Sequence, residues 1–100
     1  AILSASTTLP AAAAGDAAAG KKKAQMCQAC HGLDGMAKLP DAPNLAGQNP
    51  VYLVKTLGDY KSGARKNEVM SVAAATLSPE DIADLAAYYS SIKVTVEAQK

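Results

Sequence analysis

Apolar residues recur at helical spacing in two stretches of the chain. Positions spaced i, i+3, i+4 and i+7 share one face of an α-helix. The pattern predicts two amphipathic helices, each with an apolar face that must be buried. The positions are Leu53, Val54, Leu57 and Tyr60 in the first stretch, and Ile82, Leu85, Ala86, Tyr89 and Ile92 in the second.

Local signals indicate where these two helices begin and end. Asn49 followed by Pro50 is typical of a helix start, and Gly63 is typical of a helix end. Ser78 followed by Pro79 and two acidic residues starts the last helix, because negative charge is favourable at the positive end of the helix dipole. We expect helices from Pro50 to residue 61 or 62 and from Pro79 onward.

A further helix is expected near the beginning of the chain. Asp16 can cap a helix that runs to about Gln28, with the run Lys21-Lys22-Lys23 on its solvent side. Gly20 inside that helix costs about 1 kcal/mol relative to alanine. We therefore expect another element to approach closely at Gly20, and the last helix is the natural partner.

The rest of the chain divides into a loop, a short helix and a tail. Residues 32–49 contain several glycines and prolines, which predicts a loop wrapped around a ligand. Residues 66–75 are rich in alanine and include Met70, so we expect a helix there. Residues 93–100 have no clear assignment, and we expect them to fray.

The candidate chemistry lies in Cys27-Gln28-Ala29-Cys30-His31. Two cysteines separated by two residues and followed by histidine form the attachment signature of a c-type haem. Two thiols can add to two vinyl groups on one porphyrin edge, while the imidazole of the next residue reaches the iron. The motif predicts Cys27 and Cys30 as covalent anchors and His31 as an iron ligand.

Three other kinds of site could be built from these residues. A zinc site needs four ligands, but Cys27, Cys30 and His31 are the only thiols and the only imidazole in the chain. A thioredoxin-like redox pair belongs to a βαβ pattern that this alanine-rich chain lacks. A structural disulfide would leave the adjacent histidine as a coincidence.

Methionine is the expected second axial ligand, because its thioether is a soft donor to haem iron. Met26 is adjacent to Cys27, and Met36 lies only five residues beyond His31. Met70 follows His31 by thirty-nine residues, which is enough chain to pass round the porphyrin. We therefore expect His31 and Met70 to bind the iron.

Composition and charge agree with a bound haem and exclude some partners. One hundred residues with no Phe, no Trp and four Tyr form a single domain with little large apolar volume, which a porphyrin would supply. The formal net charge of +1 moves to about zero once propionates and ferric iron are included. The only basic run has no interleaved aromatics, so nucleic-acid binding is not expected.

The first residues have a different character from the rest. Residues 1–14 carry no charge and end in a run of alanines, which is typical of an export signal near its cleavage site. We expect residues 1–14 to be the remnant of an export signal, or an apolar N-terminal arm, and residues 15–100 to be the functional domain.

Several motifs in order resemble class I c-type cytochromes, the small all-α electron carriers, and especially the bacterial single-domain type that also forms one half of dihaem carriers. The resemblance runs from about residue 15 to 92. It depends on the motifs CQACHG, APNLAGQ, YLVKTLGDYKSGAR, the segment at Met70, and SPEDIADLAAYY. It implies about four helices around one haem, with the terminal helices packed together.

The resemblance also implies roles for further residues. Cys27 and Cys30 would form thioethers, with His31 and Met70 as axial ligands. The others are Pro43, whose carbonyl would accept the His31 Nδ1 proton, Arg65, which would pair with a haem propionate, and Tyr52, an aromatic near the haem. Leu57, on the apolar face of its helix, is expected at the haem wall.

These observations favour a monohaem electron carrier that is not an enzyme. We expect transient redox-protein partners, no small-molecule substrate, a monomer, and export to the periplasm. A subunit of a larger dehydrogenase or oxidase would use the same chemistry and stays open. A ligand-binding haem protein is less favoured, because no distal histidine or arginine for peroxide chemistry is evident.

Overall fold

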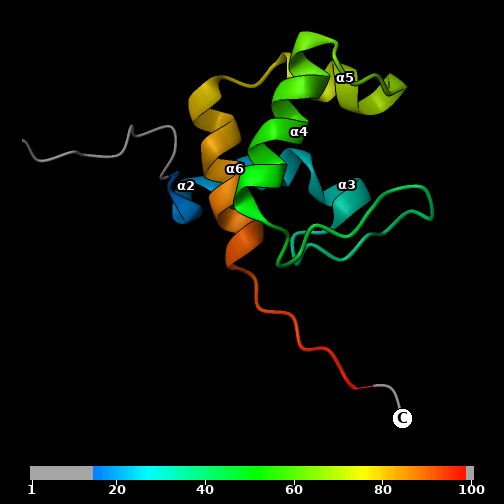
Figure 1. Cartoon of the computed structure of the whole chain (residues 1–100), viewed down its shortest axis with the longest axis vertical. Helices are drawn as coiled ribbons and strands as arrows, with labels where there is room; N and C mark the ends of the chain where they lie inside the picture. Colours follow the sequence, from blue (N-terminus) through cyan, green and yellow to red (C-terminus); the bar gives the residue numbers. More distant parts are fainter. Residues whose placement is uncertain (1–14, 99–100) are drawn as a thin grey trace, which may run out of the picture.

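Residues 15–98 are described by a computed structural model, and the chain within them is helical without any β-strand (Figure 1). The all-α class predicted from the sequence is confirmed. The elements in chain order are α2 (Ala17–Lys23), the 3-10 turn η1 (Ala24–Met26), α3 (Gln28–His31), α4 (Pro50–Ser62), α5 (Glu68–Ala75) and α6 (Pro79–Ser91).

Helices α4 and α6 begin as their sequences predict. The Asn49 side chain accepts hydrogen bonds from the first amides of α4, and Gly63 ends that helix with a left-handed φ of 89°. Ser78 and Asp81 cap α6 reciprocally, each side chain accepting from the other's backbone amide. These caps satisfy amides that would otherwise lack a partner in the first turn.

The first helix is shorter than predicted. Asp16 caps it as expected, but α2 ends at Lys23 and the chain continues through η1 before α3 begins at Gln28. A 3-10 turn advances about 120° per residue instead of about 100°. The prediction of one helix up to Gln28 is therefore wrong, and η1 changes the direction in which α3 presents its side chains.

Helices α2 and α6 pack backbone to backbone at Gly20, as predicted. A Cβ atom at Gly20 would overlap the carbonyl group of Asp84, so only glycine fits there. Gly15 meets the Ala83 carbonyl in the same way. The terminal helices of the domain are therefore in direct contact, with Ala24 fully buried just beyond α2.

Lys23 differs from the prediction for the lysine run. Lys21 and Lys22 are exposed, but Lys23 Nζ lies 2.8 Å from Asp81 Oδ1 and 2.6 Å from Asp84 Oδ2 on α6. Asp84 is buried and also accepts from the backbone amide of Asp16 at 2.7 Å. This charge network joins α2 to α6 beside their backbone contact.

The core lies mainly along the predicted apolar face of α6. Ile92 is half-buried at the end of this face, and Val54 of α4 departs from its predicted face because it is exposed. The buried cluster contains Ala24, Leu53, Leu77, Ile82, Leu85, Ala86 and Tyr89.

Residues 32–49 form the predicted loop, and its own backbone hydrogen bonds hold it together. The amides of Leu45 and Ala46 both donate to the Gly35 carbonyl, at 2.7 Å and 3.0 Å. The Lys38 amide donates to the Cys30 carbonyl at 2.8 Å. Both ends of the loop are thus fixed close to α3.

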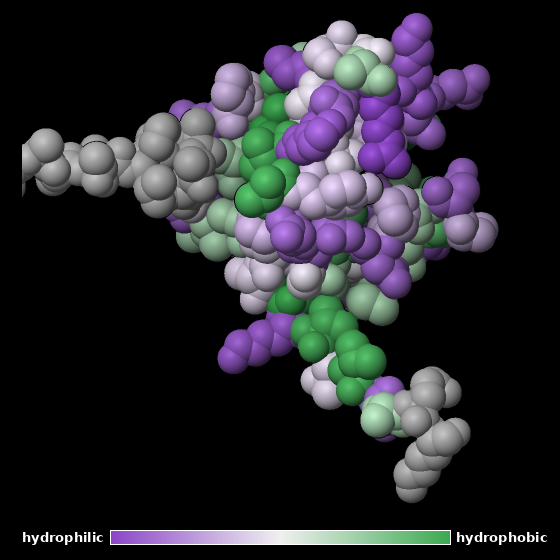
Figure 2. Space-filling model, in the orientation of Figure 1, coloured by the Kyte–Doolittle hydropathy of each residue, from purple (hydrophilic) through white to green (hydrophobic). Residues whose placement is uncertain are grey.

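The chain beyond α6 has no regular structure up to residue 98, as expected for the tail. Val94 and Val96 are 54% and 85% exposed, and Figure 2 shows a hydrophobic strip where the tail leaves the body. The predictions for residues 1–14 and for the last two residues of the tail lie outside the described residues. In the part of the chain that is described, no helix has the length and apolar character needed to cross a membrane.

Replacement of Gly20 by alanine should lower stability, whereas the same change at Gly58 should raise it. Both glycines lie inside helices, but only Gly20 is against backbone, and nothing lies within 4 Å of a Cβ at Gly58. We expect Gly20→Ala to lose about 1–3 kcal/mol of unfolding free energy through overpacking, and Gly58→Ala to gain about 0.5–1 kcal/mol. Urea unfolding of both variants measures this, and an equal response at the two sites would contradict the close contact.

Replacement of Asp84 by asparagine should destabilise the protein more than Asp59→Asn does. Asp59 makes an exposed ion pair with Lys55 on one helix, at 2.7 Å, and is the matched control. At pH 7 we expect a loss of about 1–3 kcal/mol for Asp84→Asn and under about 0.5 kcal/mol for Asp59→Asn. Thermal melts of the two variants measure the difference.

The cost of Asp84→Asn should also depend on pH. The Asp16 amide and Lys23 hold the pKa of Asp84 below its usual range, and Lys23 lowers the pKa of Asp81 to about 2. A carboxyl group with a lowered pKa in the folded state stabilises above its unfolded pKa of about 3.9, and this contribution is lost as pH falls below that value. The difference between wild type and variant should shrink from about pH 4 downward; a constant difference would show that the charge of Asp84 is not responsible.

Candidate haem-binding site

His31 is buried, and its imidazole is held by a carbonyl group of the loop. Its Nδ1 atom lies 2.9 Å from the Pro43 carbonyl oxygen, and the residue is 6% exposed. A carbonyl oxygen can only accept, so this bond places the proton on Nδ1. In the neutral imidazole the lone pair is then on Nε2, which is the form that binds a metal.

Cys27 and Cys30 are free, half-buried thiols next to this imidazole in the sequence. Cys27 immediately precedes α3, and its carbonyl accepts from the backbone amides of Cys30 and His31 at 3.3 Å and 2.9 Å. Burial raises the pKa of the Cys27 thiol, with Cys30 as a smaller cause. A redox-active CxxC pair needs a lowered pKa, so the thioredoxin-like alternative is not favoured.

Arg65 and Tyr52 lie together, although they are thirteen residues apart. Arg65 Nη1 donates to Tyr52 Oη at 3.4 Å, and the guanidinium lies 5.2 Å from the centre of the Tyr60 ring. Arg65 lowers the pKa of the Tyr52 hydroxyl through this contact. In residues 15–98 no carboxylate pairs with Arg65, so its other N–H groups are available to an anionic partner.

Leu57 lies on α4 and Met70 on α5, in the helices predicted for them. Neither belongs to the His31–Pro43 pair or to the Arg65–Tyr52 pair. Leu57 is half-buried on α4 against the core cluster, and Met70 is half-buried on α5. Met26 and Met36 are 51% and 47% exposed, so Met70 is the most buried of the three methionines. In Figure 1, α3, α5 and the 32–49 loop all lie to the right of α6, on the side of α4.

Comparison with known proteins identifies the family. Residues 17–93 match the sequence model described as "Cytochrome c". The chain belongs to the cytochrome c family. Membership of this family implies a covalently bound haem c with iron.

Individual cytochromes c support the same conclusion. The chain is 52% identical over 81 residues to cytochrome c-554(548) of Halomonas halodenitrificans, covering 78% of this chain and 98% of that protein. It is 50% identical over 84 residues to cytochrome c4 of Pseudomonas aeruginosa, covering 84% of this chain and 42% of that protein. The structure of reduced recombinant cytochrome c4 from Pseudomonas stutzeri superposes with a TM-score of 0.76 at 44% identity, covering 83% of this chain and 48% of that chain. The chain thus spans less than half the length of these cytochrome c4 relatives and nearly all of the Halomonas protein.

The donor set fits haem c better than a metal ion held by side chains alone. Among residues 15–98 no three His, Cys, Asp or Glu side chains are grouped to hold a metal ion. One imidazole with a fixed Nδ1 proton and two nearby thiols provide one ligand and two covalent anchors. This combination is what a cytochrome c needs on one side of its haem.

Sequence reasoning missed two contacts near His31. Tyr88 and Tyr89 of α6 donate their hydroxyl groups to the backbone carbonyls of Leu33 and Gly32, immediately after His31. Tyr89 was predicted only as part of the apolar face. The signal available in the sequence was the hydroxyl itself, because a buried tyrosine normally finds a hydrogen-bond partner for it.

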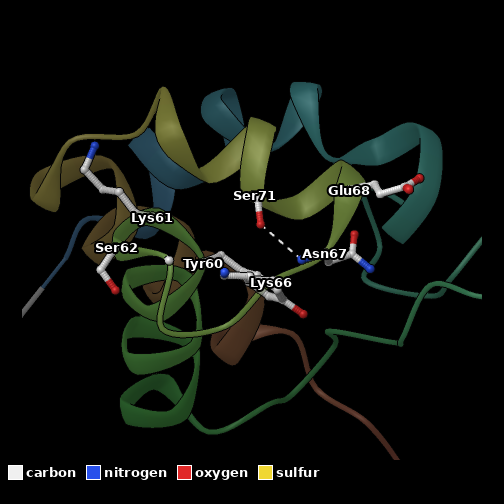
Figure 3. A pocket seen from close by; sticks show the side chains of 8 residues that line it. Tyr60, Lys61, Ser62, Lys66, Asn67, Glu68 and Ser71 are labelled. Carbon is white, nitrogen blue, oxygen red and sulfur yellow. Dashed lines mark hydrogen bonds between the residues drawn. The ribbon is translucent and has the colours of Figure 1, made fainter.

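A pocket of about 650 Å³ lies between α4 and α5, and its lining includes Tyr60, over whose ring the Arg65 guanidinium lies (Figure 3). It contains none of the eight predicted site residues. Inside it the Asn67 backbone amide donates to Ser71 Oγ at 3.0 Å. It is lined by Tyr60, Lys61, Ser62, Gly63, Lys66, Asn67, Glu68 and Ser71.

Proposed function

We propose that the domain of residues 15–100 is a one-electron carrier with a single haem c, ligated by His31 and Met70. The observation that carries this proposal is the buried His31 imidazole, fixed by Pro43 and preceded in the chain by two free thiols. One haem is expected, because the chain has only two cysteines and one histidine. Haem, when bound, supplies the Fe(II)/Fe(III) couple.

Four residues of the chain would have separate roles in holding the haem. Cys27 and Cys30 anchor the haem covalently, and His31 Nε2 binds the iron while Pro43 holds the Nδ1 proton. The pairing of His31 with a carbonyl fixes both the tautomer and the ring orientation. Electron transfer then requires no change of ligand and no proton transfer at the imidazole.

Met70 is proposed as the second axial ligand. Its half-buried position on α5 distinguishes it from Met26 and Met36, which are about half exposed. A thioether ligand favours the ferrous state and raises the reduction potential. Two protein ligands would fill the coordination of the iron, so no substrate is expected to bind there, and the domain is not an enzyme in this proposal.

Three further residues would complete the surroundings of the haem. Arg65 is proposed to bind a propionate, because its guanidinium has no carboxylate partner among the described residues and can bond a carboxylate through two N–H groups. Tyr52, bonded to Arg65, would orient it, and Leu57 would exclude water from the haem wall.

The partners are proposed to be other redox proteins that bind transiently to the monomer. Met36 and Leu39 are 47% and 46% exposed on the loop next to α3, with the exposed Lys38 between them. Such a small apolar patch suits a weak and short-lived interface. We propose a periplasmic location, since c-type haem is attached outside the cytoplasm.

An electron carrier that binds its partners transiently is favoured over a subunit of a larger complex. The Halomonas cytochrome is matched over 98% of its length, so a protein of one such domain exists among the relatives.

Treatment of the wild-type protein with organic acid should leave the haem on the polypeptide, and extraction of the haem would contradict covalent attachment.

Replacement of Met70 by alanine should open the iron to an external ligand, whereas Met36→Ala should not. The ferrous Met70→Ala protein should then bind carbon monoxide and show a lowered potential, because the soft ligand is lost. Absorption spectra with and without carbon monoxide measure this, and an open site in Met36→Ala alone would assign the ligand to Met36.

Electron transfer to a partner should depend only modestly on salt. The holoprotein is nearly neutral in total charge, so steering by its overall field is weak. We expect the bimolecular rate to change by less than about tenfold between low and physiological ionic strength. Stopped-flow measurements with the natural partner test this, and a fall of several orders of magnitude would instead indicate docking through charges such as Lys21 and Lys22.

A further inference from the structure

Two adjacent tyrosines of α6 bind two consecutive carbonyl groups directly after His31. Tyr89 Oη donates to the Gly32 carbonyl at 3.2 Å, and Tyr88 Oη donates to the Leu33 carbonyl at 2.5 Å. Their rings meet edge to face, with centroids 5.1 Å apart. Consecutive residues on a helix point about 100° apart, so the two hydroxyls reach the segment from different directions.

The same turn of α6 also binds the other side of the loop. The Gly47 amide donates to the backbone carbonyl of Tyr89 at 2.9 Å, four residues beyond Pro43. Tyr89 therefore contacts the chain just after His31 with its side chain, and the chain just after Pro43 with its backbone. Each attachment point therefore lies a few residues beyond one partner of the His31–Pro43 hydrogen bond: Gly32 directly follows His31, and Gly47 lies four residues after Pro43.

Tyr89 is well suited to hold this geometry without change. It is 2% exposed, and burial raises the pKa of its hydroxyl, which stays a donor at neutral pH. A Cβ at Gly32 would overlap the backbone of Met36, so the turn after His31 has little freedom of its own. A small shift of Gly32 or Gly47 would thus be passed to His31 or Pro43.

We propose that Tyr88 and Tyr89 are positioning residues that set the length of the hydrogen bond from His31 Nδ1 to Pro43, and through it the electron donation of the imidazole to haem iron. This inference rests on the proposed function. A stronger Nδ1–H···O bond makes the imidazole a better donor and stabilises the ferric state. Loosening the two tyrosine contacts should therefore favour the ferrous state.

The test compares Tyr89→Phe and Tyr88→Phe with two control variants of the same helix, all as holoproteins. Ser90→Ala removes a hydroxyl that bonds only to Ala87 within α6. Leu85→Ala weakens the core without removing a bond to the loop. The readouts are the midpoint potential, the NMR shifts of the His31 ring and the melting temperature.

We expect Tyr89→Phe to shift the potential upward, so that the ratio of reduced to oxidised protein at a fixed applied potential rises about threefold. Tyr88→Phe should shift it in the same direction by less, because Leu33 is farther from His31 in the chain. The His31 ring resonances should move in both variants. Ser90→Ala should change neither the potential nor the His31 resonances, and Leu85→Ala should lower the melting temperature but leave the potential unchanged.

The outcomes separate this inference from the proposed function. Covalent haem in the wild type with an unchanged potential in both tyrosine variants would overturn the positioning role alone, as would an equal shift in Leu85→Ala. If Tyr89→Phe does not fold, Tyr88→Phe decides by the same criterion. A wild-type chain without covalent haem would overturn both proposals.

Discussion

The positions of the other elements of the domain depend on the direct contact between the backbones of α2 and α6. At Gly20 the two helices approach closely enough to leave no room for a side chain. This contact fixes α6, and α6 in turn buries the core and carries Tyr88 and Tyr89 to the loop after His31. A glycine that is not itself part of the candidate haem site thus determines where the site can be built.

Asp84 adds a directional element to this contact. Its carboxylate binds Lys23 and the Asp16 amide together, so it joins the first turn and the last turn of α2 to one point on α6. A partly buried ion pair of this kind is weak support for stability in itself, because desolvation offsets much of the attraction. Its value lies in fixing the register of two helices that touch along small residues and could otherwise slide.

The sequence predicted those parts of the fold that depend on local signals. The starts of α4 and α6 follow from Asn49, Pro50, Ser78 and Pro79, and the partner of Gly20 follows from the need for close approach. The end of α2 could not be predicted, because the change to a 3-10 turn at Ala24 has no strong local preference behind it. The ion pairs of Lys23 were missed because they depend on which side of α2 faces α6.

The contacts of the candidate site also differ in whether the sequence could predict them. The cysteine and histidine motif carries its own chemistry, and the Pro43 contact came from the resemblance to class I cytochromes. Neither the motif nor the resemblance predicted the hydrogen bonds of Tyr88 and Tyr89. These bonds join residues more than fifty positions apart, and the hydroxyl groups that make them lie on a helix face that periodicity marks only as apolar.

The attachment of the loop to the last full turn of α6 has a consequence for how the molecule opens. Amide protons exchange with solvent in cooperative units, and an element can exchange independently only if few bonds tie it to its neighbours. The 32–49 loop is bound to α6 at Gly32, Leu33 and Gly47. Its amides near these points should be released together with the C-terminal helix, so the backbone around His31 becomes accessible to solvent only when α6 detaches from the loop.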